Sequence, residues 1–203
     1  MSVLFGLYQP EEGVIKKDGK EVKITSPNDA TALHIGMVHQ HFKLVECFTV
    51  LDNIILGAEP KRGMIVDREK ARKRVLELSE RYGLKVDLDA KVEDITVGMQ
   101  QRTEILKMLY RDNEILIFDE PTAVLTPQET DKLFQVMREM KADGKSVVII
   151  THYMSEAATA DYMIVMDKGH IAMSGTPREV FTQVEKVRAL GLDVPPMTDL
   201  AHM

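Results

Sequence analysis

The sequence predicts an α/β fold with a mostly parallel sheet and an inserted helical subdomain. Three apolar runs, at residues 35–39, 115–119 and 146–151, predict strands that are buried on both faces. Segments with helical periodicity alternate with these runs, which is the order of elements found in parallel α/β sheets. The stretch from about residue 43 to 112 is almost entirely helical in pattern and predicts the subdomain.

Proline and turn signals define the first elements of the chain. Residues 1–8 are mostly apolar and predict a helical segment that ends near Pro10, because a residue before proline disfavours the helical conformation. Residues 14–24 predict a hairpin with Asp18 and Gly19 at its turn. The dipeptide Asp-Gly is a strong signal for a tight two-residue hairpin turn.

Caps and amphipathic spacing define the helices. Thr49 and Asp67 are predicted N-cap residues, and Gly57 and Gly83 close the helices that they begin. Pro127 stands at a favoured first-turn position. Helices are therefore predicted over residues 49–57, 67–83, 97–112, 127–142, 154–159 and 177–190, with a second hairpin over residues 162–174.

The composition is that of an ordinary globular chain with one cysteine. The 203 residues carry a formal net charge of −6, which argues against non-specific nucleic-acid binding as the main role. A lone cysteine, Cys47, excludes an internal disulfide framework and fits a reducing compartment, and we expect it to be a small buried side chain. No apolar run approaches the ~20 residues of a membrane-spanning helix.

Two adjacent carboxylates, Asp119 and Glu120, end the apolar run that begins at Ile115. Ligands bind beyond the carboxyl ends of strands in open α/β sheets, so this pair is expected at a ligand-binding edge. The first carboxylate suits Mg²⁺ binding, and the second suits activation of a water molecule. The simpler alternative is that Asp119 only caps the end of the strand.

Three further segments place polar residues beside predicted strands or helices. Gln40 and His152 each follow an apolar strand, where the alternatives to a site residue are a polar loop residue and a structural histidine. Thr96 and Gly98 open a helix, whose N-terminal amides and positive dipole end can bind phosphate. The simpler alternative there is an N-cap in which Thr96 accepts a hydrogen bond from the amide of Met99.

The order and spacing of these segments resemble the ATPase subunits of ABC transporters. Gln40 matches the Q-loop glutamine, residues 95–101 the signature motif, residues 115–120 the Walker B motif, residues 123–126 the D-loop and His152 the switch histidine. The D-loop departs from the family pattern, because its last residue is threonine where aspartate is usual. The resemblance covers the chain from residue 1 to about residue 180.

Details of the sequence resemble importers within this family. The stretches at residues 4–10, 26–30, 36–42 and 97–102 look like the first ATPase domain of nucleoside and simple-sugar importers. The C-terminal part, from Val165 onward, looks more like the ATPases of energy-coupling-factor importers. This mixture leaves the transported solute open.

The resemblance implies a P-loop NTPase-like fold and the cofactors ATP and Mg²⁺. It implies that Asp119 and Gln40 hold Mg²⁺, and that Glu120, His152 and Gln40 act on the attacking water and the γ-phosphate. Transmembrane permease subunits would dock near residues 40–60, which places the chain in the cytoplasm at the inner face of the cell membrane. A second, head-to-tail ATPase subunit would hold the ATP that contacts the signature residues Thr96, Val97, Gly98, Met99 and Gln100.

No G-x-x-x-x-G-K-[ST] phosphate loop (Walker A) occurs in the 203 residues. Relatives carry that loop immediately before a helix that ends like residues 4–8, so the resemblance predicts an N-terminally truncated ABC ATPase domain over residues 1–178, with its first strands and phosphate loop missing. Residues 179–203 are predicted to be a C-terminal helix and tail. We expect the chain alone to be marginally stable and without ATP turnover. The alternative is a natural variant that works without its own phosphate loop.

The resemblance thus implies an ATP-binding and ATP-hydrolysing subunit of an importer for nucleosides, sugars or similar small solutes. One alternative is a non-catalytic ABC module that pairs with a complete ATPase and supplies only its signature motif. Another is a soluble ABC-type ATPase that acts on nucleic acid or ribosomes. The acidic net charge and the importer-like segment at residues 40–56 disfavour a nucleic-acid partner.

Overall fold

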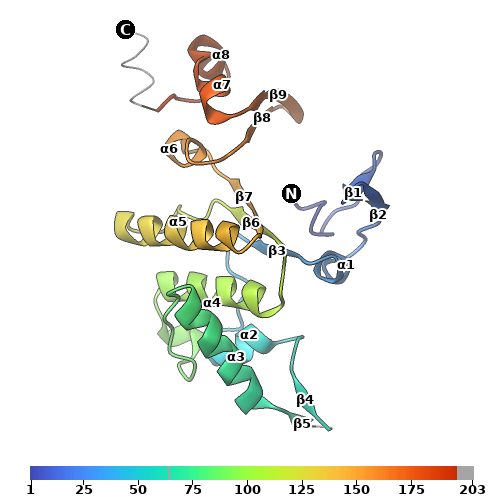
Figure 1. Cartoon of the computed structure of the whole chain (residues 1–203), viewed down its shortest axis with the longest axis vertical. Coiled ribbons are helices and arrows are strands. Elements are labelled where there is room, and N and C mark those ends of the chain that lie inside the picture. Colours follow the sequence, from blue (N-terminus) through green and yellow to red (C-terminus); the bar gives the residue numbers. More distant parts are fainter. Residues whose placement is uncertain (64, 196–203) are drawn as a thin grey trace. The chain divides into compact units, whose positions relative to one another are not determined.

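The structure, a computed structural model, describes residues 1–63 and 65–195. These residues belong to two compact units, of which the first spans Met1–Val148 and the second begins at Ile149 (Figure 1). The predicted division into a partial ATPase domain over residues 1–178 and a C-terminal helix and tail over residues 179–203 stays a prediction. The last part of the predicted tail, residues 196–203, lies outside the described residues.

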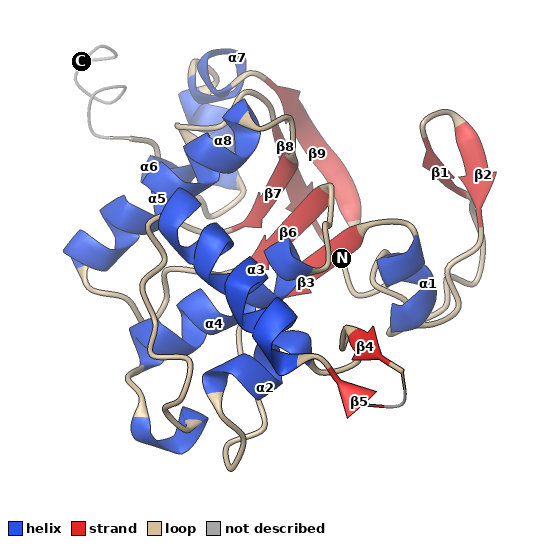
Figure 2. Cartoon of the chain, turned by 60° about the horizontal axis from the view of Figure 1, so that its bottom comes forward, coloured by secondary structure: helices blue, strands red, loops and turns tan. Residues whose placement is uncertain are grey.

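A parallel pair of strands forms the centre of the first unit. Strand β3 (Ile35–Val38) pairs in parallel with β6 (Ile115–Asp119), and Val38 lies opposite Phe118. β3 is buried along its whole length, and the three central residues of β6 are buried. The sheet has the order β3-β6-β7, as Figure 2 shows. The predicted parallel sheet is therefore confirmed.

Strand β7 (Ser146–Ile150) is more exposed than its apolar sequence predicts. Ser146 is exposed, and the four residues after it are only half-buried. Within the described residues β7 lies at the edge of its sheet, so one side of its backbone pairs with a neighbouring strand. The predicted strand is confirmed, but the prediction of complete burial is wrong, because an edge strand lacks neighbours that would cover it.

The first predicted hairpin is confirmed. Strands β1 (Ile15–Lys17) and β2 (Lys20–Val22) pair antiparallel. Asp18 and Gly19 have φ angles of 52° and 76°. A type I′ turn requires positive φ at both central positions, so the Asp-Gly signal acted as expected.

Helix α1 (Pro27–Ala32) is absent from the sequence-based prediction. Ser26 accepts a hydrogen bond from the amide of Asp29, and the Asp29 side chain bonds back to the amide of Ser26. This capping box, followed by proline in the first turn, is a helix-start signal. With six residues, α1 is too short for apolar periodicity to reveal it.

Residues 1–8 form hydrogen-bonded turns rather than the predicted helix. The amide of Leu7 donates to the carbonyl of Ser2 across 2.9 Å, and the amide of Gly6 donates to the carbonyl of Val3 across 3.0 Å. These two bonds form a Schellman motif, the arrangement that closes helices, and Gly6 has the positive φ, 74°, that it requires. The closing motif leaves too few residues for successive i→i+4 bonds, so the helix prediction was wrong.

Helices make up most of the predicted subdomain. Thr49 and Asp67 cap two of them as predicted. A short hairpin of β4 (Lys61–Arg62) and β5 (Ile65–Val66) interrupts the helical pattern, with Pro60 just before it and Gly63, which has φ at 66°, between its strands. The helices of this region are α2 (Val50–Ile55), α3 (Arg68–Arg81), the 3₁₀ turn η1 (Val92–Asp94) and α4 (Val97–Tyr110).

Helix α5 (Pro127–Ala142) has the predicted bounds. It begins with a capping box between Thr126 and Glu129. Just beyond its other end, Asp143 accepts a hydrogen bond from the hydroxyl of Tyr82 across 2.6 Å, and Arg81 forms an ion pair with the same carboxylate. These contacts tie the end of α5 to the end of α3.

The second unit contains the second predicted hairpin. Strands β8 (Met163–Asp167) and β9 (His170–Gly175) pair antiparallel, and Lys168 and Gly169 have φ angles of 47° and 81°. Helix α6 (Met154–Ala157) precedes the hairpin. The core of this unit consists of buried apolar side chains from these elements, the last helices and the segment after them: Met154, Met163, Val165, Val180, Phe181, Val184, Val187 and Val194.

The helix predicted over residues 177–190 is divided into α7 (Pro177–Phe181) and α8 (Val184–Ala189). The Thr182 hydroxyl and the Gln183 side-chain amide both donate to the carbonyl of Glu179, across 3.0 and 3.1 Å. Polar side chains that bond to nearby carbonyls compete with continued helix, which explains the break.

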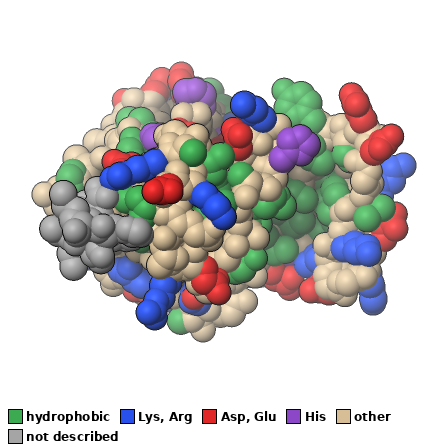
Figure 3. Space-filling view, turned by 90° about the horizontal axis from the view of Figure 1, so that it is seen from above, with side chains coloured by type: hydrophobic (Ala, Val, Ile, Leu, Met, Phe, Trp, Pro, Cys, Tyr) green, Lys and Arg blue, Asp and Glu red, His purple; other side chains and the backbone are tan. Residues whose placement is uncertain are grey.

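The surface of the described residues is mixed in character. Figure 3 shows acidic and basic side chains interspersed with apolar ones on one face. Cys47 is exposed, so its expected burial is wrong. Within residues 1–63 and 65–195, no helix has the length and apolar character to cross a bilayer.

Candidate nucleotide site

The parallel register of β3 and β6 brings Gln40 and Glu120 together. Val38 lies opposite Phe118, so the residues two positions further along each strand leave the same edge of the sheet. Nε2 of Gln40 donates a hydrogen bond to Oε2 of Glu120 across 3.1 Å. Two residues with predicted roles in water activation therefore meet at the carboxyl edge of the sheet, where α/β proteins bind ligands.

The backbone of Glu120 has a left-handed conformation, with φ at 47°. This region is uncommon for a residue with a Cβ. The next residue, Pro121, is buried, and its carbonyl accepts a hydrogen bond from Nε2 of Gln101 across 2.6 Å. Gln101 belongs to α4 and is 4% exposed. The turn after β6 is thus bonded both to the end of β3 and to α4.

Gln101 was not among the predicted site residues, although its position carries a signal. It lies four residues before Ile105 and eight before Leu109, so helical periodicity puts it on the buried face of α4. A buried glutamine requires hydrogen-bond partners. That requirement could have indicated a contact outside its own helix.

Asp119 ends β6 and is partly exposed. Its charge acts on His39, which follows the neighbouring strand β3. Burial lowers the pKa of His39, the charge of Lys43 lowers it further, and the charge of Asp119 opposes both effects. The carboxylate of Asp119 is thus close enough to act on His39, although the charge of Lys43 has the larger effect.

The oxygen donors at this edge fit Mg²⁺. The ion prefers carboxylate and amide oxygens together with water and phosphate oxygens. Asp119 supplies a carboxylate, and Gln40 can supply its amide oxygen because its nitrogen donates to Glu120. In the described part of the chain, no group of three or more His, Cys, Asp or Glu side chains forms a metal site by itself, which is compatible with an ion that keeps water and substrate oxygens.

The signature residues stand at the start of α4. Oγ1 of Thr96 accepts a hydrogen bond from the amide of Met99 across 3.4 Å, so the N-cap considered as the simpler alternative is present. Val97 is 46% exposed, Gly98 is buried, and the Gln100 side chain bonds to carbonyls of the preceding turn. Nucleotide binding by these residues stays a prediction.

Gly98 allows a close contact between α4 and α5. A Cβ at this position would lie 2.4 Å from Oε1 of Glu129. The other oxygen of Glu129 accepts bonds from the amide and the hydroxyl of Thr126 in the capping box of α5. These bonds lower the pKa of Glu129. The absence of a side chain at Gly98 thus leaves room for the carboxylate that begins the next helix.

His152 lies in the second unit, shortly after β7. It is exposed, and its ring centroid is 4.1 Å from that of Tyr153. Its contact with a γ-phosphate stays a prediction.

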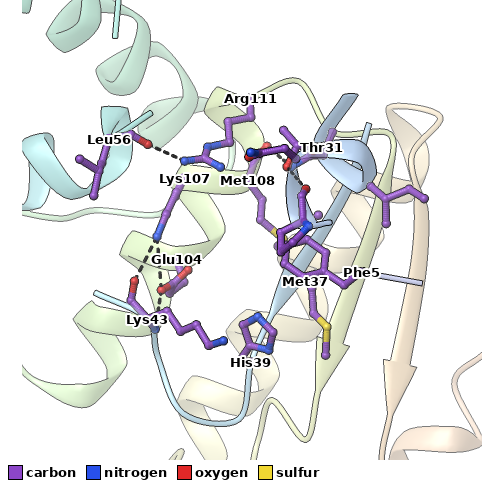
Figure 4. Close-up of a pocket in the computed structure, with 15 residues that line it drawn as sticks. Phe5, Thr31, Met37, His39, Lys43, Leu56, Glu104, Lys107, Met108 and Arg111 are labelled. Carbon is purple, nitrogen blue, oxygen red and sulfur yellow. Dashed lines mark hydrogen bonds and ion pairs between the residues drawn. The ribbon is translucent and has the colours of Figure 1, made fainter. Parts of the chain in front are cut away.

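A pocket of about 240 Å³ opens in the first unit beside the segment predicted to dock a permease (Figure 4). Lys43, Lys107 and Arg111 bring cationic groups to its wall, and Glu104 brings a carboxylate. Burial lowers the pKa of Lys107, whose Nζ donates to the carbonyl of Lys43 across 3.2 Å. Apolar side chains complete the wall, among them Phe5, Met37, Leu56 and Met108.

Comparison with known proteins identifies the family. The sequence model described as ABC transporter matches residues 1–123. This chain belongs to the ABC transporter family. The nucleoside import ATP-binding protein NupA of Lactococcus lactis subsp. cremoris is 54% identical over 170 residues, which are 83% of this chain and 34% of NupA. The guanosine import ATP-binding protein NupO of Bacillus subtilis is 59% identical over 148 residues, which are 73% of this chain and 29% of NupO.

This chain spans about a third of the length of the curated relatives it matches. Among solved structures, cbiO1 from Clostridium perfringens, part of the ABC transporter complex cbiONQ, has a TM-score of 0.75 and 27% identity, covering 100% of this chain and 81% of cbiO1. The dimeric ATP-binding cassette MJ0796 bound to ADP and Pi has a TM-score of 0.73 and 26% identity, covering 87% of this chain and 78% of that cassette. The predicted α/β fold of P-loop NTPase type and the resemblance to nucleoside and sugar importers are confirmed.

Proposed function

We propose that this chain is part of the ATP-binding and ATP-hydrolysing subunit that powers an ABC importer of nucleosides, sugars or similar small solutes, and that it has no ATP turnover by itself because its 203 residues contain no phosphate loop. The hydrogen bond between Gln40 and Glu120 carries the proposal, because it joins two strand ends at the ligand-binding edge of the sheet. Asp119 lies beside them on β6. Membership of the ABC family, which hydrolyses ATP, supports the same reaction.

Each residue of this edge has a distinct role in the proposal. Glu120 orients the attacking water and accepts its proton, and the amide of Gln40 fixes the carboxylate for this task. Bound Mg²⁺, held by Asp119 and the amide oxygen of Gln40, would neutralise charge on the phosphates. For His152, which belongs to the second unit, the family role of a γ-phosphate contact stays a prediction. Most of the acceleration then comes from positioning and from fixed charges.

A second ABC subunit completes the site in this proposal. The start of α4 presents backbone amides and the positive end of the helix dipole, which suit the phosphates of an ATP held by the opposite subunit. Dimeric ATP-binding cassettes among the similar solved structures support a pair of subunits, for which we propose a head-to-tail arrangement. The five signature residues of this contact are Thr96, Val97, Gly98, Met99 and Gln100.

The class of solute and the place of action follow from the relatives. NupA is named a nucleoside import protein and NupO a guanosine import protein. We therefore assign nucleosides as the first solutes to test, with sugars second. The subunit would act on the cytoplasmic side of the membrane, bound to its permease.

The pocket beside residues 40–60 is the proposed permease contact. Its three cationic groups, on Lys43, Lys107 and Arg111, exceed its one carboxylate, on Glu104, within a chain whose net charge is −6. A permease segment with apolar side chains and a carboxylate would complement this wall. Lys43→Glu should reduce copurification of the permease with the tagged chain, whereas Lys73→Glu on the exposed surface of α3 should not.

Phosphate release from Mg-ATP tests the proposed reaction. The tagged chain is purified from native membranes together with its permease, as wild type and as Glu120→Gln. Loss of a positioned general base should lower turnover by roughly 10²- to 10⁴-fold. Glu114→Gln is the matched control, because this exposed carboxylate directly precedes the other end of β6 and forms an ion pair with Lys17 across 2.9 Å.

The same assay distinguishes the non-catalytic alternative. If the chain supplies only its signature motif, the turnover of the complete partner ATPase would persist in Glu120→Gln and would be lost when Gly98 is replaced by aspartate. Labelled-nucleoside uptake by cells that carry each variant then connects hydrolysis with transport.

A further inference from the structure

The segment between Pro121 and Glu129 is attached to α4 at both of its ends. At its start, Nε2 of Gln101 donates to the Pro121 carbonyl across 2.6 Å. At its end, the carboxylate of Glu129 lies against the site where Gly98 lacks a side chain. Gly98 and Gln101 are three residues apart and therefore lie on one face of α4.

The hydrogen bond from Gln101 to Pro121 lies next to Glu120, whose backbone has an uncommon left-handed conformation. Glu120 has φ at 47°, which surrounding contacts must maintain. Its side chain is bonded to Gln40, and its carbonyl accepts a hydrogen bond from the amide of Ala123 across 3.4 Å, which is long for a backbone bond. The bond from Gln101 to Pro121 fixes the next carbonyl along the chain.

Burial strengthens this second constraint. Gln101 is 4% exposed and Pro121 is buried, so water does not compete well for the Pro121 carbonyl. Loss of the donor would leave a buried carbonyl without this bond, which favours a different turn. The buried bond from Gln101 therefore stabilises this conformation of the turn, together with the backbone bonds from Ala123 to Glu120 and from Leu125 to Thr122.

We infer that Gln101 is a positioning residue, which holds the backbone of Glu120 through the Pro121 carbonyl. The general base and the signature end of α4 then move together, so binding of an ATP at Gly98 changes the orientation of Glu120 in the same subunit. The catalytic meaning of this link rests on the proposed function. The conformational link itself does not require ATP turnover.

Nuclear magnetic resonance of the 203-residue chain without nucleotide tests the link. Gln101→Leu removes the donor at similar volume, and Gln100→Leu is the matched control, because the Gln100 side chain bonds to Val92 and Ile95 instead. Gln101→Leu should shift the amide signals of Glu120, Thr122 and Ala123 and the side-chain amide signal of Gln40. Gln100→Leu should leave these four signals within the line width.

A second variant keeps the test decisive if Gln101→Leu does not fold. Gln101→Glu has the same shape but donates to Pro121 only when its new carboxyl is protonated. The Thr122 and Ala123 signals should therefore return toward wild type as the pH is lowered. Signals that stay at wild-type positions at every pH in a folded Gln101 variant would overturn the inference.

Turnover of the permease-bound subunit gives an independent readout. Misplacement of Glu120 should lower kcat by about tenfold or more, with KM for ATP changed less than about twofold. If the spectral shifts occur but wild-type turnover is absent, the proposed function fails and the link stands. If turnover is present and the Gln101 variants keep both kcat and the wild-type spectra, the link fails and the proposed function stands.

Discussion

Gln40 donates a hydrogen bond from Nε2 to Oε2 of Glu120 across 3.1 Å, although 80 positions separate the two residues in the sequence. The bond exists because β3 and β6 are parallel neighbours that end at the same level. It gives the carboxylate a fixed partner and directs the amide nitrogen of Gln40 away from a cation. This relationship makes the role of Gln40 testable.

Replacing Gln40 should weaken the dependence of the reaction on Mg²⁺. Gln40→Leu removes both the bond to Glu120 and an amide oxygen, and loss of such a group near a metal typically costs about 10- to 100-fold in metal affinity. The Mg²⁺ concentration for half-maximal phosphate release should rise accordingly. His41→Leu, at the exposed neighbouring position, is the control. An unchanged Mg²⁺ curve in Gln40→Leu would exclude Gln40 from the metal site.

Gly98→Ala should leave stability nearly unchanged and become stabilising once Glu129 is truncated. Alanine in a helix is favoured over glycine by about 1 kcal/mol. The new Cβ would displace the carboxylate of Glu129, which lies 2.4 Å from its position, and would weaken a cap worth about 1 kcal/mol. These two effects cancel in the wild-type background.

The Glu129→Ala background separates the two effects, because the displaced carboxylate is no longer present. Urea unfolding should then show a gain of about 1 kcal/mol from Gly98→Ala. Additive free energies across the four proteins of this cycle would show that Gly98 and Glu129 do not interact.

Gly6→Ala should be more destabilising than Gly83→Ala, although both glycines have a left-handed backbone. Gly6 has φ at 74°, and a Cβ there would lie 2.4 Å from the backbone C and O atoms of Ser26. Gly83, with φ at 62°, has no atom within 4 Å of its Cβ site. Both alanines suffer the left-handed backbone, which costs roughly 1 kcal/mol, but only the first also forces two backbone segments apart.

Thermal unfolding of the two variants measures this difference. We expect Gly6→Ala to lose at least about 2 kcal/mol, in the range of overpacked core sites, and Gly83→Ala about half of that. Equal losses would show that the approach of Gly6 to Ser26 is not constrained.

The contact between Tyr82 and Asp143 should make stability fall at high pH. Burial and the bond to Asp143 raise the pKa of Tyr82 to about 12, above its ordinary value of 10.0. A raised folded-state pKa means that the contribution is complete below pH 10 and is lost as the pH rises toward 12. Tyr82→Phe should reduce the fall of the urea unfolding midpoint with rising pH in this window. Tyr8→Phe, at an exposed position, should not change it.

The same contact has the opposite dependence in acid. The hydroxyl of Tyr82 and then the guanidinium of Arg81 lower the pKa of Asp143 below its ordinary value. Its contribution is therefore present above that ordinary value and is lost as the pH falls through the lowered pKa. If the free energy of unfolding falls equally with decreasing pH in wild type and in Asp143→Asn, this assignment is contradicted.

Local signals in the sequence predicted most elements, because their causes lie within a few residues. Thr49, Thr96 and Thr126 cap their helices through amides three positions away. Asp18-Gly19 and Lys168-Gly169 form turns through their own backbone angles. One wrong prediction also has a local cause that periodicity does not show. Thr182 and Gln183 both bond to the carbonyl of Glu179 and break a helix that apolar spacing predicts as continuous.

The sequence by itself determined the family, the strand-end carboxylates and the helix that carries the signature residues, because motif order and caps are properties of the chain. The tertiary structure alone decided that Gln40 meets Glu120, that Gln101 holds the Pro121 carbonyl and that β7 is half-buried. The first two contacts depend on how β3, β6 and α4 pack, and the third depends on which strands are neighbours. Such contacts join residues that are distant in sequence, so no local pattern contains them.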